Sequence, residues 1–116
     1  MLEDIGSEQK DQLWRFLRAA DAIEREVGLP MSLTLLRMMS VLMNARQQNR
    51  SISLKSFYLQ IPQSEANLRR MCRLLERKGL VRMEQSQFDG RSRVPVATPL
   101  LEKIYADLEA AMLNAD

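Results

Sequence analysis

Arginine and asparagine side chains gather in one short stretch of the sequence, residues 64–78. Arginine carries a planar fork of N–H donors that can bond two acceptors of guanine or clasp a phosphate, and asparagine can bond adenine through two atoms in the same way. Such a cluster indicates chemistry suited to nucleic-acid recognition. Ala66 is short enough for the backbone to approach DNA closely. The candidate DNA-binding residues of this stretch are Ser64, Ala66, Asn67, Arg69, Arg70 and Arg73.

The spacing of apolar residues predicts that about 64–78 form a recognition helix. Ser64 can cap its N-terminus, and Gly79 suits the left-handed conformation that often ends a helix. The apolar residues recur at the i, i+3, i+4, i+7 spacing of a buried helical stripe. The residues expected to face inward are Leu68, Met71, Cys72 and Leu75.

The opposite face of this helix is expected to carry the cations. At 100° per residue, Arg70 and Arg73 lie opposite the apolar stripe. Asn67 and Arg69 lie on its flanks near the N-terminal end, which enters the major groove in helix-turn-helix proteins. The alternative interpretation is an ordinary solvated face on which acidic neighbours such as Glu65 balance the positive charge.

A basic hairpin is predicted directly after this helix. Residues 80–85 and 93–98 show strand-like alternation or β-branched content, and Asp89-Gly90 between them is a strong turn signal. Arg91 and Arg93 place two cations near the tip, so a wing of about 86–93 could reach phosphates or the minor groove. The alternative is an ordinary solvated turn in which Asp89 pairs with Arg91.

The stretch before the recognition helix completes a helix-turn-helix. Ser53 can cap a short helix, and Pro62 prevents that helix from continuing, so that two helices are joined by a tight turn.

From Phe57 onward the sequence resembles the MarR-type (multiple antibiotic resistance) bacterial transcriptional regulators. The resemblance rests on Phe57, Ile61, Leu68, Leu75-Glu76, Gly79-Leu80-Val81 and Asp89-Gly90-Arg91.

This resemblance implies a fold that is mainly α with a small β-hairpin wing, a winged helix-turn-helix. It implies a sequence-specific transcriptional regulator whose partner is double-stranded DNA. In the family, the residue matched by Asp89 orients a basic partner, and the residue matched by Arg91 probes the minor groove. The chain departs from the family pattern at Tyr58, which replaces a small residue, and at Pro62 in the turn.

The remaining segments are expected to complete one domain, residues 1–116, and to form its dimer interface. The domain comprises an N-terminal helix in 1–28, the winged core in 32–98 and a C-terminal helix in 99–116. A single recognition helix binds weakly, so we expect a homodimer formed through the two terminal helices. The alternative is that they only cover the core of their own chain. Their apolar residues at helical spacing are Leu13, Phe16, Leu17, Ala20, Ile23 and Val27, and Leu100, Leu101, Ile104, Leu108 and Met112.

The distribution of charge agrees with a DNA-binding centre, although the net charge is only +2. Residues 51–98 hold nine basic and four acidic side chains, whereas residues 1–50 hold seven of each and residues 99–116 hold one basic and four acidic. The positive excess therefore lies in the segment where a polyanion would dock. A winged-helix module that binds protein without specific DNA binding is the alternative.

Other functions find little support in the composition. The chain has no histidine and one cysteine, and it lacks a glycine-rich phosphate loop, so we expect neither an enzyme nor a metal or cofactor site. No apolar run is long enough to cross a membrane, and the N-terminus is unlike a signal peptide, which favours a cytoplasmic protein. Cys72 is interpreted as a small buried apolar residue and not as a redox sensor.

Overall fold

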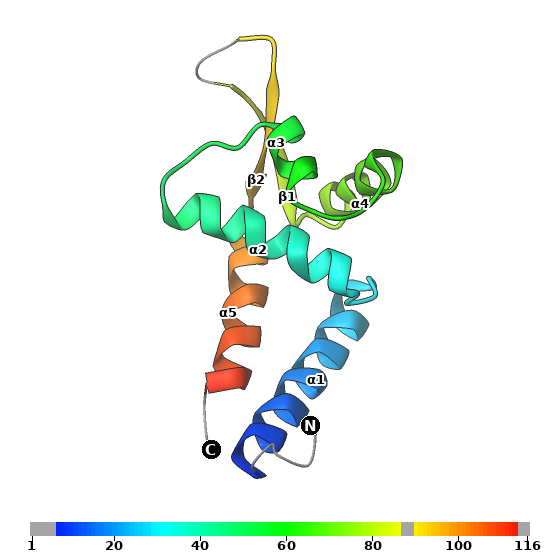
Figure 1. Cartoon of the computed structure of the whole chain (residues 1–116), viewed down its shortest axis with the longest axis vertical. Helices are drawn as coiled ribbons and strands as arrows, with labels where there is room; N and C mark the ends of the chain where they lie inside the picture. Colours follow the sequence, from blue (N-terminus) through cyan, green and yellow to red (C-terminus); the bar gives the residue numbers. More distant parts are fainter. Residues whose placement is uncertain (1–6, 87–89, 114–116) are drawn as a thin grey trace. The chain divides into compact units, whose positions relative to one another are not determined.

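The computed structural model describes residues 7–86 and 90–113. In these residues the chain forms five helices and one antiparallel hairpin, in the order helix, helix, helix, helix, strand, strand, helix (Figure 1). The helices are α1 (Ser7–Val27), α2 (Leu33–Gln47), α3 (Leu54–Leu59), α4 (Glu65–Arg77) and α5 (Pro99–Leu113), and the strands are β1 (Val81–Gln85) and β2 (Arg93–Ala97).

The chain divides into two compact units. One unit spans residues 32–102 and contains α2, α3, α4, the hairpin and the first turn of α5. The other unit contains α1 and the part of α5 from Lys103 onward.

Three serines start three helices of the unit formed by residues 32–102. Ser32, Ser53 and Ser64 each have an extended backbone and accept a hydrogen bond from the amide three residues later. The N–O distances are 3.2, 3.1 and 3.2 Å, respectively. A short polar side chain in this position satisfies one of the free N–H groups at a helix start. The cap positions proposed from the sequence at Ser53 and Ser64 are therefore confirmed.

Two glycines end helices in the left-handed conformation. Gly28 has φ 79° after α1, and Gly79 has φ 76° after α4. The chain closes around Gly79 with a hydrogen bond from the amide of Leu80 to the carbonyl of Leu75 at 2.9 Å. Residues with a Cβ rarely adopt this conformation, so glycine here directs the chain from α4 into β1.

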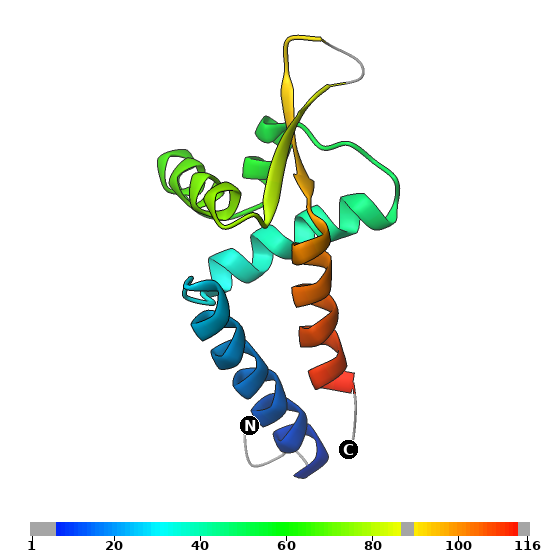
Figure 2. The same ribbon diagram turned by 180° about the vertical axis from the view of Figure 1, so that it is seen from behind.

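The core of the unit formed by residues 32–102 is built from apolar side chains of every element. Met38 and Met39 of α2 are fully buried, so these two methionines serve packing. β2 contacts α2 and α3, while β1 contacts α4, so the hairpin joins the helices into one unit (Figure 2). The largest fully buried side chains are Phe57, Met38, Met39, Leu42, Leu68, Leu75, Leu80, Leu101 and Val81.

The hairpin pairs β1 and β2 in one antiparallel register. Val81 lies opposite Ala97, and Gln85 lies opposite Arg93. The amide of Ser86 continues the ladder by bonding the carbonyl of Ser92 at 2.8 Å. The two strands predicted from the sequence are therefore present at nearly the predicted positions.

The unit formed by α1 and the later part of α5 leaves large apolar side chains exposed. Leu13, Trp14 and Leu17 of α1 are 55%, 61% and 42% exposed. Leu13 and Leu17 were both predicted to lie on the apolar face, but the residues of that face that are buried are Ala20 and Ile23. Among the described residues, the first half of α1 therefore presents an exposed apolar stripe.

No helix in the described part of the chain is both long enough and apolar enough to cross a membrane.

Candidate nucleic-acid interface

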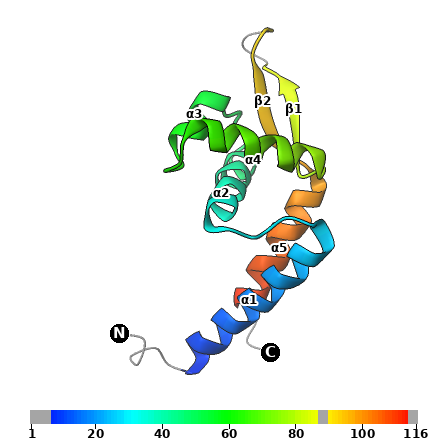
Figure 3. The ribbon, with the colours of Figure 1, turned by 90° about the vertical axis from the view of Figure 1, so that its right-hand side faces the viewer.

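α4 separates a buried stripe from a cationic face, as its spacing predicted. Leu68 and Leu75 are fully buried and Cys72 is nearly so, whereas Met71 is half-buried. Figure 3 shows α4 along its length, with α3 near its N-terminal end. The exposed residues of α4 include Ala66, Arg69, Arg70, Arg73 and Arg77.

The N-terminal turn of α4 holds a chain of side-chain hydrogen bonds. Asn67 donates from Nδ2 to Oε1 of Gln63 at 3.0 Å, and its Oδ1 accepts from Nη2 of Arg70 at 2.8 Å. Ser64, a predicted binding residue, uses its hydroxyl oxygen to accept from the amide of Asn67. Gln63 was not among the predicted binding residues, although the spacing 63, 67, 70 places it on the face shared with Asn67 and Arg70.

Arg69 and Arg73 lie at the side of α4 that lines a pocket with α3 and β1. Arg69 forms an ion pair with Glu65 at 3.2 Å, one helical turn away. Both side chains are well exposed, so this pair restrains the guanidinium only weakly. Among the described residues, Arg73 has no acidic group within ion-pair distance. Arg73 is therefore the less restrained of these two cations.

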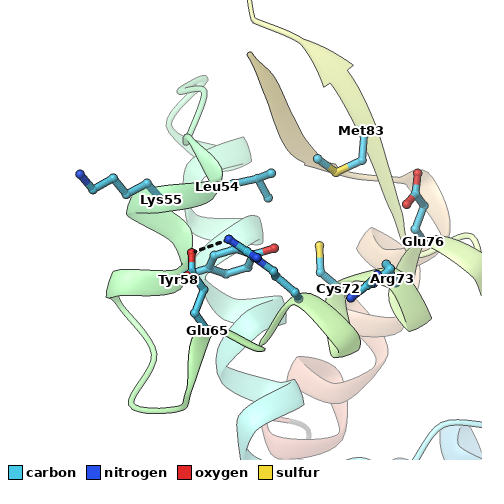
Figure 4. Close-up of a pocket in the computed structure, with 9 residues that line it drawn as sticks. Leu54, Lys55, Tyr58, Glu65, Cys72, Arg73, Glu76 and Met83 are labelled. Atoms are coloured by element: carbon cyan, nitrogen blue, oxygen red, sulfur yellow. Dashed lines mark hydrogen bonds and ion pairs between the residues drawn. The ribbon is translucent and has the colours of Figure 1, made fainter. Parts of the chain in front are cut away.

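A pocket of about 550 Å³ lies between α3, α4 and β1 (Figure 4). Leu54, Tyr58, Cys72 and Met83 supply its apolar part. In Figure 4 the sulfur of Cys72 points toward the strand that carries Met83. Charged side chains also line the pocket, with three cations and two anions: Lys55, Arg69, Arg73, Glu65 and Glu76.

Tyr58 and Cys72, two titratable groups in the apolar part of this pocket, are held in their neutral forms. Burial, with a smaller contribution from the neighbouring Cys72, raises the pKa of Tyr58 to about 12. Burial also raises the pKa of the Cys72 thiol, against the hydrogen bond that the Tyr58 hydroxyl donates to it. A protonated thiol is a weak nucleophile. This environment supports the interpretation of Cys72 as a packing residue.

The hairpin places the two predicted wing cations at the surface. Arg91 and Arg93 are both exposed. The side-chain amide of Gln85 donates a hydrogen bond to the carbonyl of Gly90, which joins the end of β1 to the turn. Asp89, predicted to orient a basic residue of the wing, lies outside the described residues.

Arg46 was not identified from the sequence, but it joins three elements. Its Nη1 donates to the carbonyl of Ala97 at 3.1 Å, and its guanidinium forms an ion pair with Glu102. Ala97 ends β2, and Glu102 lies in the first turn of α5. Arg46 therefore fastens the base of the hairpin and the start of α5 to α2.

A short helix, a turn, an exposed second helix and a two-stranded hairpin define the winged helix-turn-helix fold. No protein-family model matches the sequence, and no curated protein matches it. Solved structures match by fold. CouR from Rhodococcus jostii RHA1, solved with p-coumaroyl-CoA bound, superimposes with a TM-score of 0.58 at 22% sequence identity. That match covers 86% of this chain and 66% of CouR.

Two further structures are similar. A MarR-family transcriptional regulator from Silicibacter pomeroyi has a TM-score of 0.57 at 20% identity, over 90% of this chain and 66% of its own. BpsR from Bordetella bronchiseptica, whose DNA binding is regulated by 6-hydroxynicotinic acid, has a TM-score of 0.50 at 21% identity, over 89% of this chain and 75% of its own. The chain thus spans slightly less than two thirds of the first two structures. The likeness confirms the predicted fold, the winged helix-turn-helix of MarR-like regulators.

Proposed function

We propose that the chain is a sequence-specific transcriptional regulator that binds double-stranded DNA as a homodimer. α4 would enter the major groove, and the wing of about 86–93 would lie at the minor groove or the phosphates. The observation that carries this proposal is the exposed face of α4, where Arg70 and Arg73 stand opposite the buried stripe formed by Leu68 and Leu75. The fold shared with DNA-binding regulators supports it.

The role of each cation follows from its surroundings. Arg70 would read a base, because its side chain projects from the N-terminal half of α4 and is aligned by Asn67. Arg73 and Lys55 lie at the pocket between α4 and β1, where they would meet a phosphate. Arg91 and Arg93 would extend these contacts along the wing. The two parts together would bind adjoining grooves of one DNA half-site.

The homodimer is proposed from the terminal helices. Leu13, Trp14 and Leu17 expose apolar surface on α1, and Met112 and Leu113 do so at the end of α5. Exposed apolar side chains at helical spacing are typical of an interface. Two copies would also supply the two recognition helices that a palindromic site needs.

The salt dependence of duplex affinity tests the electrostatic part of this proposal. A dimer that neutralises about eight phosphates should lose affinity with a log–log slope near −7. Arg73→Ala should make the slope shallower by about two, one unit from each subunit. Lys10→Ala is the matched control, since it removes an exposed cation from α1 and should leave the slope unchanged. A flat salt response of the unaltered protein would contradict DNA binding and favour a protein-binding module.

A further inference from the structure

The side-chain amide of Asn67 is engaged on both of its ends. Its oxygen accepts from Arg70 at 2.8 Å, and its nitrogen donates to Gln63 at 3.0 Å. The same nitrogen lies 3.8 Å from the sulfur of Met71, a weak acceptor. The amide nitrogen has two hydrogens, and Gln63 and Met71 supply an acceptor for each, whereas a bidentate contact with adenine needs one hydrogen free beside the oxygen. In this arrangement Asn67 therefore orients its neighbours and does not itself offer a base both an oxygen acceptor and a free N–H donor.

Arg70 keeps two parallel N–H donors free for a base while it donates to Asn67. A guanidinium has five N–H groups, which form two forks of two parallel hydrogens. The bond to Asn67 uses one hydrogen on Nη2, so one fork remains whole whichever hydrogen is used. Arg70 can therefore bond O6 and N7 of a guanine without leaving Asn67.

Gln63 presents a second donor beside Arg70. It lies in the turn before α4, where its backbone amide bonds the carbonyl of Ile61 at 2.8 Å. Its Oε1 accepts from Asn67, and among the described residues its Nε2 has no partner. Gln63 is exposed, so while Asn67 holds its oxygen the two Nε2 hydrogens can donate to an acceptor on a neighbouring base.

We propose that Gln63, Asn67 and Arg70 read adjacent base pairs as one unit, with Gln63 as a further specificity-determining residue and Asn67 as the positioning residue between the two readers. This inference rests on the proposed function, because it concerns how α4 reads DNA. It assigns preference at one base pair to Arg70 and at the adjacent base pair to Gln63. Asn67 acts on both positions without contacting either base.

The test uses the full chain and a duplex recovered by selection from a random pool. Affinity is measured for that duplex and for each single base-pair substitution in the half-site. Arg70→Ala should reduce discrimination at one position from at least about fivefold to nearly none, and Gln63→Ala should do so at the adjacent position. Asn67→Ala should weaken discrimination at both positions.

Asn67→Asp separates the effect of Asn67 on Arg70 from its effect on Gln63. An aspartate still accepts from Arg70 but cannot donate to Gln63. Discrimination should therefore persist at the position read by Arg70 and be lost at the position read by Gln63. Overall affinity falls through the added negative charge, so the readout is the preference at each position. The matched control is Gln48→Ala, which breaks the similar amide pair between Gln48 and Asn44 at the C-terminal end of α2 and should change neither position.

The possible outcomes distinguish this inference from the proposed function. If the unaltered protein enriches no duplex, the proposed function fails, and so does the inference that Gln63, Asn67 and Arg70 read adjacent base pairs together. If it enriches a motif but Gln63→Ala and Asn67→Ala retain full discrimination, only the inference that these residues read adjacent base pairs together is overturned. Thermal unfolding of each variant shows that lost discrimination does not reflect lost folding.

Discussion

Nη1 of Arg46 lies 3.1 Å from the carbonyl oxygen of Ala97, so that α2 holds the last residue of β2. The same guanidinium forms an ion pair with Glu102 in the first turn of α5. Ala97 is buried, and a buried carbonyl that loses its donor is costly. The contact therefore secures the base of the wing on the helical part of its unit.

Removing this contact should lower stability. Arg46→Ala is expected to reduce the free energy of unfolding by about 1 kcal/mol, since one hydrogen bond is lost and the ion pair is partly exposed to solvent. Urea denaturation measures the change. Arg37→Ala, which truncates an exposed arginine on the same helix, is the control and should stay within about 0.5 kcal/mol of the unaltered protein. Equal losses in the two variants would show that the contact contributes nothing specific.

The buried stripe of α4 should dominate the stability of the helix-turn-helix. Leu68 is fully buried, so Leu68→Ala should lower the free energy of unfolding by about 2–5 kcal/mol through lost burial and the remaining cavity. Leu59→Ala removes the same atoms from a side chain that is 77% exposed, and it should have little effect. Chemical denaturation of both variants compares them directly. Similar losses at the two leucines would contradict the assigned inward face.

Alkaline pH should weaken the fold through Tyr58 and Cys72. Burial raises the pKa of Tyr58 from 10.0 to about 12 and raises the pKa of Cys72 above its ordinary 9.0. The folded chain keeps these protons at pH values where the unfolded chain has released them. This stabilisation is complete below the unfolded pKa values and should be lost as the pH rises from about 9 toward 12.

Tyr58→Phe checks the pH effect. Without the phenol, the free energy of unfolding should decline less steeply in the alkaline range than it does in the unaltered protein. Urea unfolding at a series of pH values gives both curves. Parallel curves would show that Tyr58 does not contribute to the alkaline loss.

The exposed stripe of α1 should support the dimer. Leu17→Asp places a charge among Leu13 and Trp14, so the dimer should dissociate at protein concentrations where the unaltered chain remains dimeric. Sedimentation equilibrium measures the change. Leu59→Asp, which alters an exposed leucine of α3, is the control and should leave the association constant unchanged. A monomeric unaltered protein would rule out the proposed interface.

Local sequence patterns were sufficient to predict most of the winged unit. The spacing of Leu68, Cys72 and Leu75 identifies the buried face of α4, and the left-handed preference of glycine identifies its end at Gly79. These features depend on residues within one or two turns of each other. For that reason they are visible without knowledge of the tertiary structure.

Other features depend on contacts that a pattern does not show. Arg46 meets Ala97 across 51 positions of sequence. The bond between Gln63 and Asn67 depends on the direction that each side chain takes, which spacing permits but does not determine. Periodicity placed Leu17 on the apolar face of α1, but it could not show that this position stays uncovered within one chain.

Selection of bound duplexes from a random DNA pool tests the proposed function most directly. We predict enrichment of an inverted repeat whose half-sites lie about one helical turn apart, because two copies of α4 would enter successive major grooves on one side of the duplex. Recovery of a pool that remains random after repeated rounds would contradict it.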